Sequence, residues 1–583
     1  MNVPRLVPGR ASLSTRVVRR MAEFSWVDVV VAVAVLVGLY VVVRVGGGTT
    51  VSFVPSKVSG IDTDPARLPY YAARSLLRMF AALGLSLAFT LVWAYAAAHS
   101  RRLERVLIPA LDILQSVPIL GFLTILVTGF IALFPHSLFG LECASVFAIF
   151  TSQAWNMTFA FYHSLITVPR ELDELSRSMG FSRWMRFWKI ELPSGAINLV
   201  WNGMMSFGGG WFFLVASELI SVSNRHYVLP GVGSYAGTAI ATGDLSRVGW
   251  AIATMAVMVI GVNFLFWRPL VAWAERFKVE QSEAVHVQRS LVLDFLRRSH
   301  WPRALGRVMA PLREAANRAG RVFGVDDRPL QEHPLRRRAG DLAFALVVCG
   351  LTGWGLLDLL GYLRDRTGLS VFTQPLLLGL ATLIRVVVLV AAATLVWVPI
   401  GVKIGFSPRL TRIAQPVVQI LASFPANFLF PLATWFFLKT GLSLNIGGIL
   451  LMALGAQWYI LFNTIAGAMA IPTDLREAMD DLGVRGWRRW RRLIIPGIFP
   501  AYVTGGITAS GGAWNASIVA EIVTFGGTTL TATGLGAYIA HATEHGDYPK
   551  ILAGIAVMSL YVVGLNRLVW RRLYRLAENR YSL

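Results

Sequence analysis

The sequence predicts an all-α polytopic membrane protein with about twelve transmembrane helices, arranged as two parallel repeats of six. Two observations predict this class: the number of long apolar runs, and a polar segment that occurs twice at a fixed separation. The chain has 583 residues, of which 55% are hydrophobic and 15% are charged. Soluble domains are about 25% charged, so most of this chain is expected to lie in a bilayer.

Twelve apolar runs are long enough to span a membrane. Crossing about 30 Å of hydrocarbon takes roughly 20 residues in a helix, and backbone polar groups in lipid must pair within the segment, so these runs are predicted to be helices. The first run lacks a signal-peptide cleavage site and is predicted to be retained. The predicted spans are 26–46, 74–97, 107–133, 141–166, 195–219 and 247–271, followed by 340–362, 379–402, 415–438, 445–469, 498–522 and 549–570.

The two halves match residue by residue, which predicts an internal duplication with the same topology in both copies. Glu174 and Glu477 are separated by 303 positions, as are Gly180 and Gly483. We therefore divide the chain into a basic N-terminal tail, a first repeat, a basic linker with short amphipathic helices on the inner leaflet, a second repeat and a C-terminal tail. These segments are 1–25, 26–274, 275–339, 340–573 and 574–583.

The basic excess is explained by topology. Lys and Arg total 54 against 32 Asp and Glu, a formal net charge of +22. The basic clusters fall in alternate loops, which the positive-inside rule places in the cytoplasm together with both termini. Attraction to lipid headgroups accounts for the remaining basic surface, and nucleic acid is not an expected partner. The clusters include Arg101, Arg102, Arg105, Arg183, Arg186, Arg297, Arg298, Arg409, Arg412 and 485–492.

Each copy of the polar segment is predicted to form a short acidic helix, at about 169–180 and 472–483. A proline suits the first helical position, and acidic residues near the start are favoured by the helix dipole. Gly180 and Gly483 are predicted to end these helices, because glycine adopts the left-handed conformation most cheaply. A basic, aromatic stretch follows each helix and is expected to lie on the headgroups.

These segments resemble the cytoplasmic loop of binding-protein-dependent ABC importer permeases. The two motifs are Glu174-Leu175-Ser176…Gly180…Ile190-x-Leu192-Pro193 and Glu477-Ala478-Met479…Gly483…Leu493-x-Ile495-Pro496. The chain further resembles the nitrate, sulfonate, taurine and bicarbonate branch of this family. The residues that carry this resemblance are Ser75-x-x-Arg78, Pro109…Ser116-x-Pro118, Trp211 with Glu218, and Gly231-x-Gly233. The resemblance covers nearly the whole chain outside the first 25 residues and the linker.

The resemblance implies two permease units of the type I importer fold, fused in one chain of the bacterial inner membrane. Two ATP-binding subunits, which carry ATP and Mg, would each receive one acidic helix, and a periplasmic or lipid-anchored binding protein would deliver a small solute, expected to be an anion. The residues implied in ATPase coupling are Glu171, Glu174, Ser176, Gly180, Asp474, Glu477, Ala478 and Gly483. A lipid-surface helix is the alternative reading of each segment.

Six intramembrane residues are candidates for the substrate pathway or gate, because polar groups inside a membrane are functional candidates. They are Arg78, Trp211, Glu218, Arg385, Trp514 and Glu521. A hydrogen bond to a neighbouring helix would also explain the two glutamates. The arginines could attract an anion, with snorkelling towards headgroups as the alternative. Glycine clusters such as 208–210 are expected to allow close helix packing.

No enzyme chemistry is predicted. The chain has no G-x-x-x-x-G-K-[ST] phosphate loop, so ATP hydrolysis is expected in separate chains. No catalytic residue and no cofactor of its own are expected. No metal site is expected either, and His163, His541 and His545 are interpreted as loop or interface residues. Two alternatives remain open: an importer for a non-anionic organic compound, and a stand-alone secondary transporter.

Overall fold

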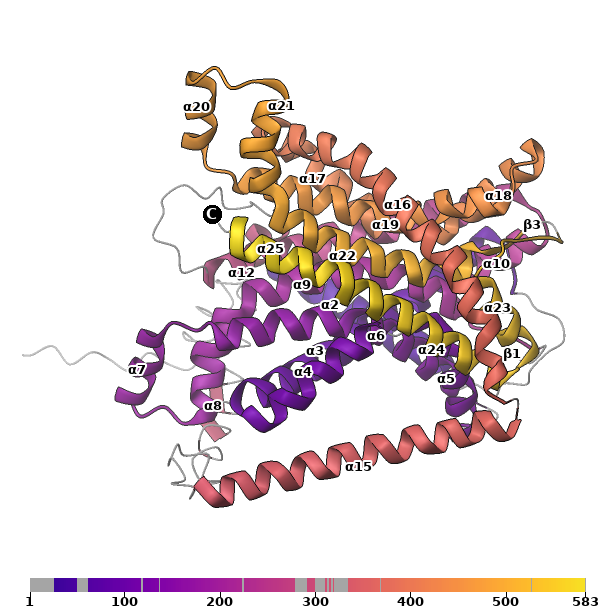
Figure 1. The fold of residues 1–583 in the computed structure, drawn as a ribbon, viewed down its shortest axis with the longest axis horizontal. Helices are drawn as coiled ribbons and strands as arrows, with labels where there is room; N and C mark the ends of the chain where they lie inside the picture. Colours follow the sequence, from indigo (N-terminus) through magenta and orange to yellow (C-terminus); the bar gives the residue numbers. More distant parts are fainter. Residues whose placement is uncertain are drawn as a thin grey trace, which may run out of the picture.

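The computed structural model describes residues 26–49, 61–116, 119–135, 137–222, 225–277, 291–298, 310–311, 314–315, 318, 334–366, 368–525 and 527–581. The predicted N-terminal tail (1–25) and most of the predicted linker lie outside these residues. The described part confirms an all-α polytopic fold, drawn in Figure 1. Its strands form two short hairpins, which the sequence analysis did not predict.

The first repeat contains the helices α2 (Trp26–Gly46), α3 (Leu68–His99), α4 (Arg101–Ser116), α5 (Ile119–Leu133), α6 (Leu138–Ile166), α7 (Arg170–Ser178), α8 (Arg183–Arg186), α9 (Leu192–Glu218), α10 (Val232–Ala241), α11 (Leu245–Val262) and α12 (Arg268–Ala274). The hairpin strands β1 (Leu219–Val222) and β2 (Arg225–Val228) connect α9 to α10. In the predicted linker, α13 (Leu291–Arg298) is helical.

The second repeat contains α15 (Pro334–Arg366), α16 (Thr373–Gly405), α17 (Pro408–Ser423), α18 (Phe430–Thr440), α19 (Leu444–Ala470), α20 (Thr473–Asp481), α21 (Gly486–Arg489), α22 (Ile495–Ala520), α23 (Leu535–His545), α24 (Tyr548–Leu565) and α25 (Arg571–Tyr581). The strands β3 (Ile522–Phe525) and β4 (Thr528–Thr531) connect α22 to α23. The second repeat therefore follows the element order of the first.

The duplication extends to irregular backbone. A π-helical turn precedes the fifth long helix of each repeat, at Phe187–Glu191 and Trp490–Ile494. Another interrupts the sixth, at Asn263–Trp267 and Asn566–Trp570. Both pairs are 303 positions apart, so the two copies share details that are rare in ordinary helices.

Nine helices in the described part of the chain are long and apolar enough to cross a membrane, and ten if one bent pair counts as a span. The nine correspond to nine predicted spans. Among the other three, 26–46 coincides with the helix α2, which has 21 residues. Of the two remaining predicted spans, 415–438 is bent, and 107–133 includes residues 117–118, which lie outside the described part.

The bend between α17 and α18 corrects the prediction of a continuous span at 415–438. The two parts of this segment meet at an angle of 79°. Phe424, which precedes Pro425, has an extended backbone with φ −72° and ψ 127°, because a residue before proline avoids the α conformation. In the first repeat, the predicted span 107–133 contains α4 and α5; residues 117–118 between them lie outside the described part, so the continuity of this span stays a prediction.

The helix α5 and the segment beside α18 contribute to the contact between the two repeats. In the first repeat α3, α6 and α9 pack in sequence, and in the second α16, α19 and α22 do the same. Leu123 and Val127 of α5 belong to a buried cluster that consists mostly of second-repeat residues and also includes Leu141 of α6. Phe428, beside α18, is buried in the main cluster of the first repeat. These contacts join the two repeats, in addition to the packing of α5 on α6 and of α18 on β3 within their own repeats.

The helix α15 lies apart from the bundle in Figure 1. It begins at Pro334, six residues before the predicted start of the second repeat. None of its most apolar window, within Leu346–Arg366, is buried. A helix that is apolar on all sides is stabilised by lipid or by a neighbouring helix, which is consistent with its predicted role as a span.

Candidate functional site

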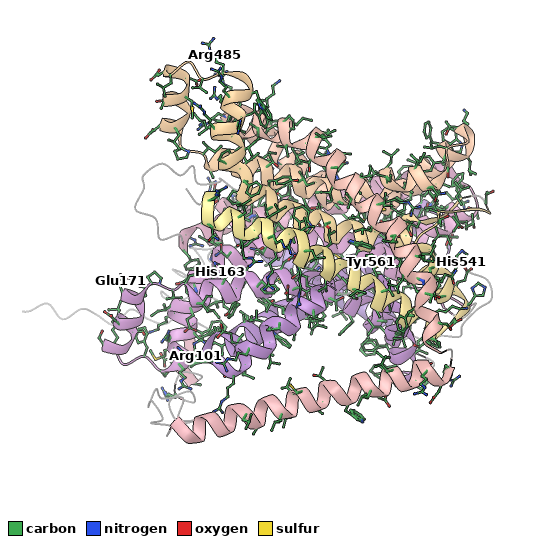
Figure 2. All side chains as sticks on the ribbon, viewed as in Figure 1. Arg101, His163, Glu171, Arg485, His541 and Tyr561 are labelled. Carbon is green, nitrogen blue, oxygen red and sulfur yellow. The ribbon has the colours of Figure 1, made fainter. Side chains whose placement is uncertain are left out.

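The two predicted coupling helices, α7 and α20, project from the same end of the bundle (Figure 1). Figure 2 shows Glu171 of α7 at this end together with Arg101 and Arg485, while His541 lies at the opposite end. Following the predicted topology and function, we refer to these as the coupling end and the outer end. The basic loops represented by Arg101 and Arg485 therefore share one side, and α25 ends on that side as well.

A glycine in the left-handed conformation ends each coupling helix. Gly180 has φ 62° and Gly483 has φ 65°. The backbone N–H of Phe181 donates to the carbonyl of Ser176 at 3.0 Å, and that of Val484 donates to Met479 at 2.9 Å. This pattern caps the carbonyls at a helix C-terminus. The turn requires glycine, because a side chain at positive φ is strained.

The coupling helices expose both charge and apolar surface. Glu171, Glu174, Asp474, Glu477 and Ala478 are exposed, whereas Ser176 is 2% exposed. Apolar side chains beside them are also in solvent: Leu175 is 51% exposed, Met179 62% and Leu482 77%. Large apolar side chains exposed next to acidic groups on a projecting helix are typical of an interaction surface.

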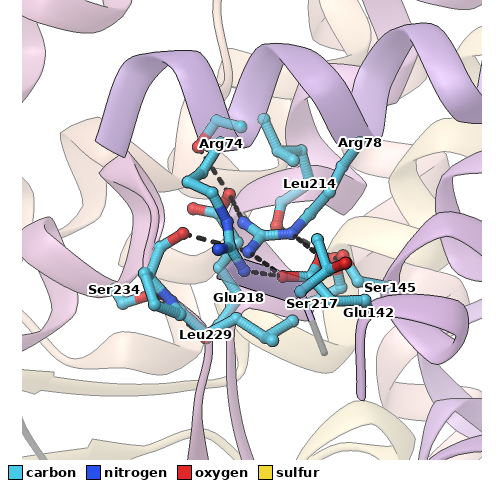
Figure 3. Close-up of polar contacts among 12 residues, drawn as sticks. Arg74, Arg78, Glu142, Ser145, Leu214, Ser217, Glu218, Leu229 and Ser234 are labelled. Carbon is cyan, nitrogen blue, oxygen red and sulfur yellow. Dashed lines mark hydrogen bonds and ion pairs between the residues drawn. The ribbon is translucent and has the colours of Figure 1, made fainter. Parts of the chain in front are cut away.

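The outer end of the first repeat contains a cluster of buried charges that joins α3, α6, α9 and α10 (Figure 3). Glu218, the last residue of α9, is fully buried and accepts hydrogen bonds from Ser75 Oγ at 2.5 Å and Arg78 Nη1 at 2.6 Å. Its other oxygen accepts the backbone N–H of Gly233 at 2.6 Å. The N-terminus of α10 therefore stabilises the carboxylate together with the arginine.

Glu142 of α6 completes this cluster. It accepts from Arg78 Nε at 2.5 Å and Nη2 at 2.8 Å, and also forms an ion pair with Arg74. Both arginines are at most 2% exposed. The cluster thus contains two arginines and two glutamates, which balances its charge inside the protein.

The second repeat contains an equivalent cluster with one arginine and one glutamate. Glu521 accepts from Thr382 Oγ1 at 2.7 Å, from Arg385 Nη1 at 2.8 Å and from the backbone N–H of Gly536 at 2.8 Å. Asn445 takes the place of Glu142 and accepts from Arg385 Nη2 at 2.7 Å. Ala381 corresponds to Arg74, because the two are separated by 307 positions, as are Arg78 and Arg385. The second repeat therefore lacks the counterparts of both Glu142 and Arg74, and each cluster stays neutral.

The sequence analysis predicted Arg78, Glu218, Arg385 and Glu521 in the pathway or gate but did not identify Arg74, Glu142 or Asn445. Two features of the sequence could have indicated Arg74 and Glu142. Arg74 lies one helical turn before Arg78, and Glu142 lies inside a predicted span. Neither arginine snorkels to a headgroup, because Arg78 is 2% and Arg385 6% exposed. Their pairing with carboxylates also leaves the anion preference without support from these residues.

The two tryptophans of that prediction are packed in the cores. Trp211 is 2% exposed and contacts Phe207 edge to face, with ring centroids 5.5 Å apart. Trp514 is 1% exposed and stacks on Tyr561 with centroids 5.9 Å apart. Their positions in the described structure are those of core residues. A gating role for the glutamates and arginines stays a prediction.

Gly231 and Gly534 allow each buried glutamate to approach the next helix. Both have extended backbone, with φ −174° and −169°, so any residue could adopt their conformation. A Cβ at either position would collide with the carboxylate of Glu218 or Glu521. We expect Gly231→Ala to lower stability by about 1–3 kcal/mol, as overpacking a well-packed core does, measured by the thermal melting of the detergent-solubilised chain.

Gly249 provides the control for this change. It lies within α11, and a Cβ there would meet no atom within 4 Å. Gly249→Ala should leave the melting temperature unchanged or raise it slightly, because alanine is favoured over glycine inside a helix. Equal melting temperatures for Gly231→Ala and Gly249→Ala would contradict the close approach of Glu218.

A cavity of about 370 Å³ lies at the interface of the two repeats. It is lined from the first repeat by residues such as Asn156, Asn202 and Phe212, and from the second by Tyr459 and Thr508, among others. No charged side chain lines it among the described residues. None of the six predicted pathway residues lines it either, whereas Gly208, Gly209, Gly511 and Gly512, predicted to serve helix packing, all do.

Comparison with known proteins agrees with this duplicated architecture. The sequence profile of the family described as "Binding-protein-dependent transport system inner membrane component" matches residues 83–270 and again residues 397–582. Each match begins within the second predicted span of a repeat and includes the predicted coupling helix of that repeat. Together the two matches cover more than half of the chain.

Individual relatives match one part of the chain at modest identity. The taurine transport system permease protein of Escherichia coli K12 is 27% identical over 31% of this chain and 62% of its own length. A nitrate import permease protein of Leptolyngbya laminosa is 26% identical over 32% and 64%. A bicarbonate transport system permease protein of Synechocystis is 28% identical over 43% and 92%.

The chain thus spans less than two thirds of the length of the first two of these relatives, and each match takes up less than half of this chain. One such relative therefore corresponds in length to one repeat of this chain, as the two family matches also indicate. The chain belongs to the family of binding-protein-dependent transport system inner membrane components, and it carries the family's domain twice.

Proposed function

We propose that this chain is the complete transmembrane part of an ATP-driven importer, with both permease units in one polypeptide. The observation that supports this most strongly is the pair of coupling helices, α7 and α20, which project from one end of the bundle with the same glycine-ended geometry. Each helix would bind one ATP-hydrolysing subunit in the cytoplasm. Both termini would then be cytoplasmic, in the inner membrane of a bacterium.

The cavity between the repeats is the proposed route of the solute. It lies at the repeat interface, where rocking of one repeat against the other would open it to each side in turn. A solute-binding protein would deliver the solute at the outer end. Neither ATP nor Mg would bind to this chain, because hydrolysis would take place in the partner subunits.

We propose a small anion as the solute, in line with the nitrate, taurine and bicarbonate permeases that the chain resembles. The uncharged lining of the cavity suits an anion held by neutral donors, among them Asn202, Asn463 and Thr508. Such a lining would bind the ion weakly enough to release it. The main selection among solutes would then be made by the binding protein.

Purification from the native host tests this proposal. We expect a nucleotide-binding subunit to copurify at two copies per chain, and the complex in liposomes to take up a labelled small anion only with ATP and the binding protein. Uptake by the chain alone under an ion gradient would instead support a secondary transporter. ATP-dependent uptake of a neutral or cationic compound would overturn the anion assignment and leave the architecture standing.

A further inference from the structure

Three potential metal ligands lie together at the outer end of the second repeat. His541, Glu544 and His545 are exposed on the last turns of α23, and their ligand atoms lie within 4.8 Å of one another. Figure 2 shows His541 at the end of the molecule opposite Glu171 and Arg485. The sequence analysis expected no metal site, because it searched for His and Cys spacings and did not weigh the glutamate between the two histidines.

The three side chains share one face of a helix. Residues separated by three and four positions are neighbours on a helix surface, so His541, Glu544 and His545 point in the same direction. Among the described residues, no hydrogen bond or ion pair engages the Glu544 carboxylate or the His541 ring. The ligand atoms are therefore available to an ion.

The His545 ring is held in the form that a metal requires. Its Nδ1 lies 2.8 Å from the carbonyl oxygen of His541. Because a carbonyl oxygen can only accept, Nδ1 must carry the proton, which leaves Nε2 of a neutral ring unprotonated. A hydrogen bond from the other ring nitrogen to a backbone carbonyl is the usual support of a metal-binding histidine.

The fold does not need these residues. In the first repeat the corresponding helix is α10, and the equivalent positions hold Thr238, Ala241 and Thr242. The two helices otherwise agree in their N-terminal glycine and in their contact with a buried glutamate. The His-x-x-Glu-His set is therefore an addition to one copy of a duplicated element.

We propose that His541, Glu544 and His545 bind a divalent transition-metal ion, with Zn²⁺ as the preferred ion. Two histidines and one glutamate form a recurring ligand set for zinc with one position left open. These ligands adjoin an open pocket of about 550 Å³, whose lining includes both histidines and Gln374. The open position would hold water or a small oxygen or nitrogen ligand from the outer compartment.

Asp547, in the same pocket, is less available as a fourth ligand. It caps α24 by accepting the backbone N–H of Lys550 at 3.2 Å, and it pairs with the ammonium of that lysine at 2.8 Å. The site is therefore expected to hold its ion with three protein ligands, which gives a moderate affinity and an exchangeable ion.

The test measures metal binding by the purified full-length chain in detergent, after tag removal and EDTA treatment. Zn²⁺ is titrated in competition with a chromogenic chelator, and Co²⁺ is used to report coordination through its visible absorption. We expect one Zn²⁺ site that is weakened at least tenfold by His541→Ala with His545→Ala, and less by Glu544→Gln. The Co²⁺ band should disappear in the double variant.

His163→Ala is the matched control, because His163 is also exposed but belongs to no such group within the described part of the chain. It should leave the site unchanged. All these positions are at the surface, so each variant should keep the melting temperature of the parent chain. Equal Zn²⁺ affinity and stoichiometry in the parent and in the double variant would overturn the proposal, as would a Co²⁺ spectrum that the double variant retains. Neither readout depends on transport.

Discussion

Replacing Arg74 by alanine, or Glu142 by asparagine, is expected to destabilise the first repeat strongly, whereas the two changes together should be tolerated. Either single change leaves an unbalanced charge in a cluster whose arginines are at most 2% exposed. Breaking a buried ion pair from one side costs about 3–5 kcal/mol. The double variant restores neutrality and reproduces the second repeat, where Ala381 and Asn445 hold these positions.

Thermal melting of the four chains in detergent measures this effect as a double-mutant cycle. The melting temperature of the double variant should lie well above that of either single variant. The exposed pair of Arg67 and Asp62, 3.6 Å apart and more than half exposed, serves as the control. Its cycle should show a coupling below about 1 kcal/mol, as surface pairs do. Additive losses from Arg74 and Glu142 would contradict the charge-balance argument.

Gly483→Pro is expected to abolish coupling to the ATPase without unfolding the chain. Proline fixes φ near −65°, whereas Gly483 has φ 65°, so the turn that ends α20 cannot form. The strain is confined to this projecting turn, because a side chain here would meet no atom within 4 Å. The membrane-spanning helices should therefore remain folded, with a melting temperature close to that of the matched Gly441→Pro variant. We expect copurification of the nucleotide-binding subunit and ATP-driven uptake to fall at least tenfold.

Gly441→Pro controls for the backbone change itself. Gly441 ends α18, has φ 71° and is also surrounded by open space. Because α18 extends away from α20 in Figure 1, this variant should keep the bound ATPase subunit. Glu477→Arg, which reverses an exposed charge on α20, should weaken binding as well. Normal ATPase binding and uptake in both Gly483→Pro and Glu477→Arg would refute the role of this helix.

Much of the fold could be predicted from local patterns. Apolar runs of about 20 residues determine helices in lipid because the backbone has no other way to satisfy its polar groups. The duplication followed from matching residues separated by 307 positions early in the repeats and by 303 positions later. The bend in span 415–438 was missed because the hydropathy is continuous across it. Pro425 was visible in the sequence, but its effect on Phe424 competes with the length of the apolar run.

The candidate site, like the fold, could be predicted only in part from local sequence patterns. The coupling helices depend on local features, namely an acidic start and a terminal glycine. The hairpins β1–β2 and β3–β4 were missed because four-residue strands give little periodic signal between long apolar helices. Glu142 was overlooked because one acid inside a span says nothing about its partner. Only the packing of α6 against α3 brings it to Arg74 and Arg78.

By itself, the sequence determined that the chain is a duplicated helical membrane protein with one short acidic helix in each half, because these properties depend on neighbours in the chain. Only the tertiary structure decided that both helices leave one end of the bundle, and that α5 contacts the second repeat as well as α6 of its own. It also decided that a cavity whose described lining carries no charged residue lies between the halves. It also paired the buried arginines with carboxylates, because a charge inside a membrane is stable only beside a partner that folding supplies.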